Sequence, residues 1–182
     1  MPRVFIALEL PPAKREELEQ FCKVNDSLSK FTWEDKSKLH LTIKFIGEMP
    51  AGDIERLKVK LAETKCSAVK TNFMMTSVIS KNNSPSIVWA SLRVTSELKS
   101  LVDACEEILS GNFSVQKEIR EYSPHITLLR VKPHYDFDEI NKFEGIELNS
   151  DEFVMNKLVL YQSELFAKGS KYTELAEYDL VI

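Results

Sequence analysis

The stretch LHLTIKFIGE, residues 39–48, decides the interpretation of this chain, because the stretch PHITLLRVK, residues 124–132, repeats its central pattern. Each contains His-x-Thr, as His40 with Thr42 and as His125 with Thr127. The chain has only three histidines, so two of them stand in nearly the same pentapeptide, about half a chain apart. Apolar and β-branched residues surround both motifs and predict two β-strands.

Successive side chains of a strand point to opposite faces. We therefore expect His40 and Thr42 to share one face, while Leu41, Ile43 and Phe45 point into a core. The second motif repeats this arrangement. Each strand then presents an imidazole beside a hydroxyl on a rigid support, which suits a catalytic group.

Apolar spacing predicts the elements before and after the first motif. Residues 3–10 form a strand that stops at Pro11 and Pro12. A helix follows, and a second one lies within residues 48–65. The first helix is supported by apolar residues at helical spacing, namely Leu18, Phe21, Cys22 and Leu28.

The second half of the chain shows the same mixture. Residues 72–80 and 86–94 form a hairpin, and KNNSPS between them predicts a longer loop. Thr95 caps the next helix and Gly111 closes it. Residues 137–143 form a short helix, and residues 153–165 and 172–182 form the last two strands.

Each half thus has a strand, a helix and further strands, with one His-x-Thr strand in each. This predicts an α+β fold in one two-lobed domain across residues 1–182. We expect two antiparallel-sheet lobes with outer helices, related by a pseudo-two-fold axis around a central cleft.

Composition excludes several classes of protein. The chain has 182 residues, is 43% hydrophobic and 29% charged, and carries a net charge of −4. A protein that grips many phosphates along a nucleic acid is basic, so any nucleic acid is held here by an end or a short piece. No run of apolar residues is long enough to cross a membrane, and the start of the chain lacks the pattern of a signal peptide.

We therefore expect a cytoplasmic protein with reduced thiols at Cys22, Cys66 and Cys105, although a catalytic cysteine remains an alternative.

The paired motifs suggest acid–base chemistry if the two lobes face each other. An imidazole has an ordinary pKa of about 6.5, so one ring can be neutral and the other protonated near pH 7. The neutral ring takes a proton from water, and the protonated ring gives one to the leaving oxygen. Two threonine hydroxyls can donate hydrogen bonds to the phosphate oxygens. The pattern favours cleavage of a phosphodiester without a metal, and a strained cyclic phosphate is a natural target.

Structural roles are the alternative for each residue. A single His-x-Thr carries little weight, because a histidine on a strand is often a hydrogen-bonded structural residue and threonine favours strands. The signal lies in the pair. Zinc is a second alternative, since two histidines can bind it, but a catalytic zinc site needs a third protein ligand. His134 in the KPHYD loop is the candidate for that ligand, although the loop is more typical of an exposed histidine.

Four other residues leave alternatives open. Trp33 and Trp89 can stack on a base or fill the core or its rim. Lys44 shares the predicted face of His40 and either adds charge to the cleft or leans into solvent. Arg130 can hold phosphate or form a surface ion pair. Strict alternation places it opposite its motif histidine, so a role in the site requires a bulge or the end of the strand.

The two motifs, HLTIKFIG and HITLLR, resemble the H-x-T-x signatures of the two-histidine (2H) phosphoesterase superfamily. The likeness is strongest to its RNA 2′,3′-cyclic phosphodiesterases, the ThpR or LigT-like family. RVFIALELP, IVWASL and LYQSEL with YTELAEYDL resemble that family's opening strand, middle strand and closing hairpin.

This resemblance implies roles for six residues in a central cleft. His40 is the proton donor to the leaving oxygen, and His125 is the base that activates water. The other four contact the substrate: Thr42 and Thr127 at the phosphate, and Phe45 and Arg130 elsewhere.

The resemblance also implies the reaction. It opens a terminal 2′,3′-cyclic phosphate of RNA to a 2′-phosphate, with no cofactor and no metal, and some members run a 2′–5′ ligation in reverse. The partners are RNA ends or small cyclic nucleotides, and we expect a monomer that binds no membrane. Two alternatives remain: a nucleotide-binding module without turnover, and a hydrolase of a non-RNA cyclic phosphate such as ADP-ribose 1″,2″-cyclic phosphate.

Overall fold

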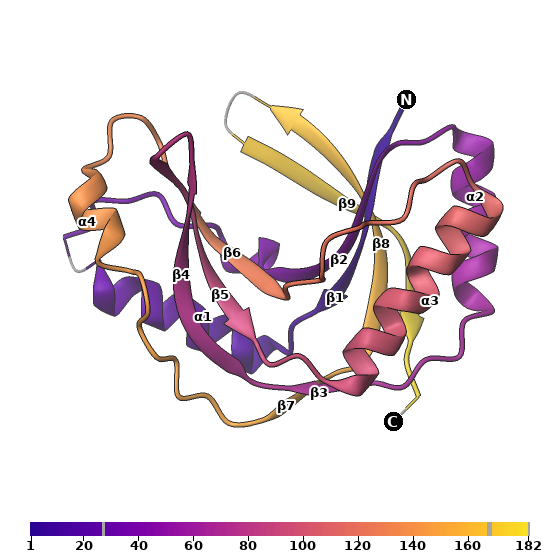
Figure 1. Ribbon diagram of the computed structural model, residues 1–182, viewed down its shortest axis with the longest axis horizontal. Coiled ribbons are helices and arrows are strands. Elements are labelled where there is room, and N and C mark those ends of the chain that lie inside the picture. The colour runs from indigo at the N-terminus through magenta and orange to yellow at the C-terminus, as the bar shows by residue number, and fades with distance from the viewer. Residues whose placement is uncertain (27, 167–168, 182) are drawn as a thin grey trace.

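The computed structural model describes residues 1–26, 28–166 and 169–181 (Figure 1). Along the chain the elements are β1 (Arg3–Glu9), α1 (Pro12–Asn25), the 3₁₀ helix η1 (Lys36–Lys38), β2 (His40–Glu48), α2 (Ala51–Ala62), β3 (Val69–Thr71), β4 (Phe73–Lys81), β5 (Ser84–Leu92), α3 (Ser96–Asn112), β6 (His125–Arg130), α4 (Phe137–Asn141), β7 (Phe153–Met155), β8 (Lys157–Phe166) and β9 (Gly169–Asp179). Both His-x-Thr motifs therefore lie in β-strands, β2 and β6, as predicted. We call these the motif strands.

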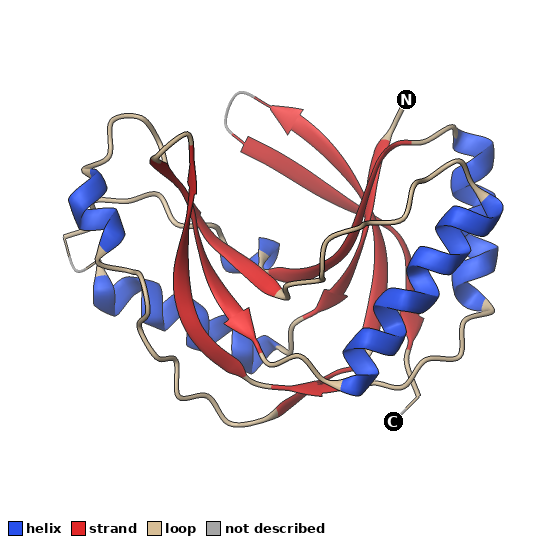
Figure 2. Ribbon diagram, viewed as in Figure 1, coloured by secondary structure: helices blue, strands red, loops and turns tan. Residues whose placement is uncertain are grey.

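The strands form two larger antiparallel sheets, with strand orders β2-β1-β8-β9 and β4-β5-β6. A short pair, β3 with β7, lies at the base of the molecule (Figure 1). Helices lie on the outer sides of the two larger sheets (Figure 2). The predicted α+β class with antiparallel sheets and outer helices is confirmed, and the pseudo-two-fold relation stays a prediction.

The motif strands are edge strands that meet in the middle of the molecule. β2 ends one sheet, β6 ends the other, and the two strands contact each other (Figure 1). The helix α3 follows β5 of the smaller sheet but packs against β2 of the larger one. The chain thus crosses between the lobes, and this crossing holds the two motif strands together.

One hydrophobic core spans both lobes. It contains alternate residues of β1 together with residues of the helices and of β6, including Val4, Ile6, Leu8, Leu57, Leu101 and Ile126. Each fully buried side chain of this size stabilises the fold by roughly 1.5–3 kcal/mol. A smaller cluster lies at α4, formed by Val88, Leu129, Tyr135, Ile140 and Phe143. The large core therefore supports both motif strands, and the smaller cluster also supports β6.

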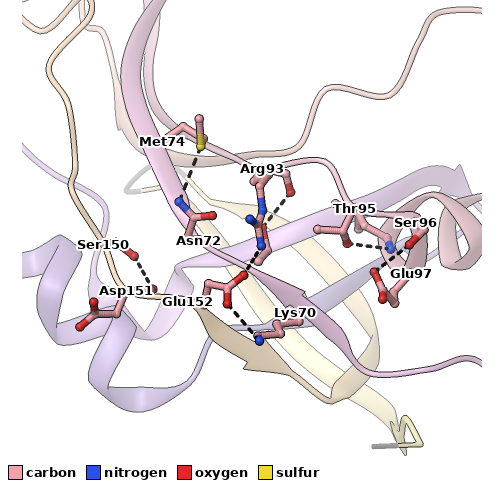
Figure 3. Close-up of polar contacts among 12 residues, drawn as sticks. Lys70, Asn72, Met74, Arg93, Thr95, Ser96, Glu97, Ser150, Asp151 and Glu152 are labelled. Carbon is pink, nitrogen blue, oxygen red and sulfur yellow. Dashed lines mark hydrogen bonds and ion pairs between the residues drawn. The ribbon is translucent and has the colours of Figure 1, made fainter.

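The helix boundaries agree with the sequence at some positions and differ at others. The Thr95 hydroxyl accepts a hydrogen bond from the backbone N–H of Leu98 and caps α3, as predicted (Figure 3). Gly111 does not close this helix, because α3 continues to Asn112. Leu28 lies beyond the end of α1 and is exposed, so its place in the helical pattern was wrong.

The hairpin of β4 and β5 has a shorter loop than predicted. Asn82 and Asn83 alone form the turn, with φ angles of 52° and 61°. Two consecutive left-handed residues match the twist of the flanking strands, and asparagine tolerates this conformation. The predicted strand at residues 153–165 is in fact two strands, because β7 and β8 belong to different sheets.

Charged residues join three segments at the base of the molecule. Glu152 forms ion pairs with Lys70, at 3.0 Å, and with Arg93 (Figure 3). These side chains are partly exposed, so each pair contributes at most about 1 kcal/mol. No helix in the described part of the chain is both long and apolar enough to cross a membrane.

Candidate active site

Two reciprocal hydrogen bonds tie the motif strands together across the lobes. The Tyr122 hydroxyl, just before β6, donates to the carbonyl of Thr42 in β2 at 2.7 Å. The backbone N–H of Glu34, just before β2, donates to the carbonyl of Leu128 in β6 at 2.8 Å. The segment leading into each motif is therefore bonded to the motif strand of the other lobe, which fixes the position of the two strands relative to each other.

The two imidazoles are held in the same way. Nδ1 of His40 lies 2.6 Å from the carbonyl oxygen of Lys38, and Nδ1 of His125 lies 2.8 Å from that of Ser123. A carbonyl can only accept, so each Nδ1 carries a proton and each neutral ring keeps its free lone pair on Nε2. Such a contact fixes both the tautomer and the ring orientation. Both rings can therefore accept a proton at Nε2, and donate it once protonated.

Thr42 completes the contacts of the first imidazole, since its Oγ1 lies 3.1 Å from Nε2 of His40. The predicted pairing of imidazole and hydroxyl on one strand face is therefore present in β2. In β6, Thr127 is half-buried and pairs with Trp89 of β5, whose ring also contacts His125. Thr127 thus lies near the second imidazole without a hydrogen bond to it among the described residues.

A β-bulge in β2 changes the face of the residues after Thr42. Thr42 and Lys44 pair with consecutive residues of β1, so Ile43 is the extra residue. A bulge reverses the alternation that follows it. Phe45 consequently pairs with Phe5, whose ring centroid lies 5.6 Å from that of Phe45 and 5.1 Å from that of His40. Phe45 is 66% exposed, so the prediction that it points into a core was wrong.

The same bulge turns Lys44 away from the face of His40, contrary to the prediction. Its ammonium group forms an ion pair with Glu106 of α3 at 2.6 Å, and both side chains are largely buried. Lys44 neither leans freely into solvent nor adds an unpaired charge to the cleft. It ties β2 to α3.

A matching bulge lies in β6. Thr127 and Leu129 pair with consecutive residues of β5, so Leu128 is the extra residue. The reversed alternation returns Arg130 to the face of His125, which is the condition that the sequence set for a role in the site. The Arg130 guanidinium also forms an ion pair with Glu34 at 3.3 Å. Both motif strands therefore have the same design: His, Thr, a bulge, and a fifth residue returned to the histidine face.

The surroundings of His40 favour its neutral form. Burial lowers the pKa of its imidazole to about 4, and the nearby charges of Arg15 and Arg130 act in the same direction. Aromatic rings enclose it, with centroids of Phe5 at 5.1 Å and of Tyr172 at 5.4 Å. A bound anion would oppose these effects and raise the pKa of the ring.

His125 has a more open environment. Its ring packs on Trp89 with centroids 4.1 Å apart, and burial lowers the pKa of its imidazole. Both rings are therefore neutral at pH 7 in the unliganded protein, whereas the sequence led us to expect one protonated ring. Trp89 contacts a motif histidine, while Trp33 packs against Phe143 and donates from Nε1 to Asp26 at 3.0 Å. Trp33 thus has the structural role among its two alternatives.

Two cavities adjoin the motif strands. One of about 640 Å³, the α3 cavity, is bordered by Thr42, Phe45 and His125, by α3, and by the segment from Glu118 to Ser123. The other, of about 440 Å³, borders His40; we call it the basic cavity. Its lining consists of Arg15, Ser37, Lys38, Leu39, His40, Tyr161, Ser170, Lys171 and Tyr172. The hydrogen bond between Thr42 and His40 connects the walls of the two cavities.

The candidates for other chemistry lie apart from this region. His134 is exposed on the turn after β6, and within the described residues no three His, Cys, Asp or Glu side chains gather as they would around a metal ion. Cys22 and Cys105 are buried, and burial raises the pKa of each thiol to about 12. Their thiolate forms are scarce at neutral pH, so neither has the properties of a nucleophile.

Several residues at the site escaped the sequence interpretation. Tyr122, Arg15, Tyr161 and Tyr172 reach the motif strands from four different segments. Tyr122 stands three residues before His125, and this proximity is the one signal that the sequence offers. The other three come from segments that only the tertiary fold brings together.

The sequence of this chain is similar to those of known proteins. Residues 8–89 match the family model described as LigT like Phosphoesterase, which includes the first motif strand. A protein of Methanocaldococcus jannaschii named RNA 2′,3′-cyclic phosphodiesterase is 28% identical over 181 residues, covering 97% of this chain and 99% of its own. One of Thermotoga maritima with the same name is 28% identical over 186 residues, covering 96% and 94%.

The fold also has known counterparts among solved structures. The crystal structure of E. coli LigT complexed with 3′-AMP aligns with a TM-score of 0.78 at 22% identity and covers 100% of both chains. The alignments with the relatives extend over nearly the whole chain, so they include the second motif strand as well as the first.

Proposed function

We propose that the chain is a member of the LigT-like phosphoesterase family, which its matches resemble, and that it hydrolyses the terminal 2′,3′-cyclic phosphate of RNA. The relatives that carry this name align over nearly the whole chain. One observation carries the proposal to the chemistry: each motif imidazole bonds through Nδ1 to the carbonyl two residues before it. Both rings are thereby oriented for proton transfer at Nε2.

In the proposed reaction His125 is the general base. Its neutral Nε2 takes a proton from a water molecule, which attacks the phosphorus in line with the leaving oxygen. The lowered pKa of His125 keeps this ring neutral and competent at pH 7. The hydroxyls of Thr42 and Thr127 donate hydrogen bonds to the non-bridging oxygens and stabilise the charge that develops there.

His40 is the proposed general acid. It must be protonated at Nε2 to give a proton to the ribose 3′-oxygen, and this leaves the product with a 2′-phosphate. In the free protein burial and neighbouring cations disfavour that proton. The negative charge of the bound phosphate opposes both effects and raises the pKa of His40, so protonation accompanies substrate binding. Phe45 and Arg130, which the bulges return to the faces of the motif histidines, are the proposed substrate contacts.

The first test is product analysis. A 2′,3′-cyclic nucleotide and an RNA oligomer ending in cyclic phosphate are incubated with the protein, and formation of the 2′-phosphate is measured across pH. We expect hydrolysis of both, with a bell-shaped pH dependence of kcat/KM that reports one acid and one base. Tight binding without product at every pH would favour a nucleotide-binding module instead.

Two further arms address the remaining alternatives. ADP-ribose 1″,2″-cyclic phosphate in the substrate panel tests for a non-RNA cyclic phosphate, and faster turnover of it than of RNA ends would change the assignment. Activity that vanishes with a chelator and returns with zinc would assign a metal to the site. We expect full activity in the presence of the chelator. We also expect the protein to be a monomer located in the cytoplasm.

A further inference from the structure

The basic cavity beside His40 contains positive charges that have no role in the proposed hydrolysis of one phosphate. Its lining residues include Arg15, Lys38 and Lys171 and no carboxylate. Arg15 pairs with Glu9 at 3.1 Å, while its Nε is buried without a hydrogen-bond partner among the described residues. Within the same residues Lys38 and Lys171 form no ion pair. Two lysines and part of a guanidinium therefore remain available to an anion.

The ammonium group of Lys38 lies beside β9, the strand that carries Lys171. Lys38 belongs to η1, and its Nζ lies 4.0 Å from the point where a Cβ would stand on Gly169, at the start of β9. Lys171 follows two residues later on β9 and is exposed. The hydroxyl-bearing residues Ser170 and Tyr172 lie in the same wall. Ammonium groups beside hydroxyls are the donors that bind phosphate oxygens.

The opposite side of the site has a different charge. The α3 cavity is lined by four carboxylates, on Asp103, Glu106, Glu118 and Glu121, against the cations Lys44, Lys99 and Arg120. Such a wall repels a polyanion, whereas a wall whose charged residues are all cations attracts it. The whole chain carries a net charge of −4, so the basic cavity is a local exception. An RNA strand leaving the catalytic histidines would run through the basic cavity.

We propose that the basic cavity is a second phosphate subsite, which binds the phosphodiester that precedes the terminal cyclic phosphate of an RNA strand. This inference rests on the proposed function and narrows its substrate class from cyclic phosphates in general to RNA ends of at least two nucleotides. A cyclic mononucleotide lacks the second phosphate and leaves the subsite empty.

The subsite adjoins the acid of the reaction. The carbonyl of Lys38 holds Nδ1 of His40, and Lys38 is one of the residues that line the cavity. Arg15, in the same lining, is one of the charges that oppose protonation of His40. A phosphate bound here offsets those charges, so the second phosphate promotes the reaction as well as binding.

The test compares three substrates: adenosine 2′,3′-cyclic phosphate, the dinucleotide ApA ending in 2′,3′-cyclic phosphate, and the same dinucleotide with an uncharged methylphosphonate linkage. We expect kcat/KM for the charged dinucleotide to exceed that for the neutral one by about 10- to 100-fold, the effect of one or two hydrogen bonds to a charged group. Equal values for the charged and neutral dinucleotides would overturn the inference.

Variants then locate the effect. Lys38→Gln, Lys171→Gln and the double variant should reduce the ratio between charged and neutral dinucleotides, and the double variant should bring it near one. The matched control is Lys36→Gln, two residues from Lys38. The ammonium group of Lys36 forms an ion pair with Glu16 at 2.5 Å, outside the cavity. Lys36→Gln should keep the wild-type ratio. A ratio that survives in the double variant, with the fold checked by circular dichroism, would overturn the assignment.

Binding separates this inference from the proposed function. The 2′-phosphate products of the charged and neutral dinucleotides are titrated by calorimetry, which needs no turnover. Absence of hydrolysis with all three substrates would end the proposed function, while the ratio of the two affinities would still decide the subsite. We expect the charged product to bind about 10-fold more tightly, and equal affinities would again overturn the inference.

Discussion

The two motif strands follow one design in two environments. In both β2 and β6 a histidine bonds through Nδ1 to the carbonyl two residues before it, and a bulge follows the threonine. His40 is almost enclosed by aromatic rings and stands near two arginines, while His125 packs against the ring of Trp89 at a tilt of 45° and borders the α3 cavity. The backbone is repeated and the surroundings are not.

This difference supports the proposal that the two copies of the motif have two roles. Acid and base assignments in a site follow from environments that act differently on similar groups. The stronger burial of His40 makes its protonated form the less stable of the two, and hence a ready proton donor once an anion has bound. His125, with a smaller burial effect, is the ring suited to accept a proton from water.

Removal of either imidazole should have the largest effect on activity and tests whether both motifs are needed. We expect His40→Ala and His125→Ala each to lower kcat by about 10²- to 10⁴-fold, because each variant lacks one proton-transfer step. Hydrolysis of a 2′,3′-cyclic nucleotide measures the loss, and circular dichroism checks the fold. The control is His134→Ala, which removes the exposed third histidine and should retain full activity. A large loss in only one motif variant would contradict the paired mechanism.

The acid stability of the fold sharpens the comparison. Between pH 6.5 and about 4 the unfolded chain binds a proton at residue 40 that the folded protein excludes, so the free energy of unfolding falls as pH falls through this window. The shift from 6.5 to about 4 corresponds to about 3 kcal/mol. His40→Ala should remove this dependence, as measured by urea unfolding at several pH values.

The matched variant for that experiment is His125→Ala. It should flatten the same pH dependence by a smaller amount, since the pKa of His125 is lowered less strongly. An equal effect of the two substitutions would show that the burial of the two rings does not differ in the way that the structure indicates.

The threonines should differ in the same sense. Thr42→Ala is expected to lower kcat by about 10- to 100-fold, because it removes a hydrogen bond to the charged phosphate and the contact with Nε2 of His40. Thr127→Ala lacks the second effect and should cost less. Thr42→Ser and Thr127→Ser keep the hydroxyl and should restore most of the activity. Losses of the same size in both alanine variants would contradict the special position of Thr42.

The smallest expected effect comes from loss of the hydrogen bond between the Tyr122 hydroxyl and the Thr42 carbonyl. Tyr122→Phe leaves the Thr42 carbonyl without its donor and should reduce the free energy of unfolding by about 1–2 kcal/mol. It should also lower kcat several-fold, because the two motifs are no longer held at a fixed separation. Tyr178→Phe is the control, since that hydroxyl donates to the Lys58 carbonyl at 3.0 Å away from the site. Equal kinetic effects would assign Tyr122 a structural role only.

The sequence predicted the two motif strands, the antiparallel α+β class and the Thr95 cap, because each of these depends on local pattern. It failed at Phe45 and Lys44, whose faces are set by the bulge at Ile43. A bulge depends on how β2 registers against β1, and alternation within one strand carries no record of that pairing. Arg130 was left open for the same reason, and the bulge at Leu128 decides its face.

Long-range contacts explain the other differences. Leu28 fits the helical spacing, but α1 ends before it, and α3 continues through Gly111 to Asn112. Tyr122 and Arg15 could not be assigned, since their roles depend on contacts with Thr42 and with the surroundings of His40. Strand pattern predicted the candidate reacting groups, while tertiary pairing determined what surrounds them.

The strand order β2-β1-β8-β9 has a consequence for synthesis of the protein. Tyr161 of β8 and Tyr172 of β9 stand beside His40 of β2. The ribosome adds both tyrosines more than 100 residues after His40. A nascent chain that has just released β6 contains both motifs, yet β1 still has one unpaired edge and His40 remains open to water. The surroundings of His40, the proposed acid, are therefore completed only when β8 and β9 have been made.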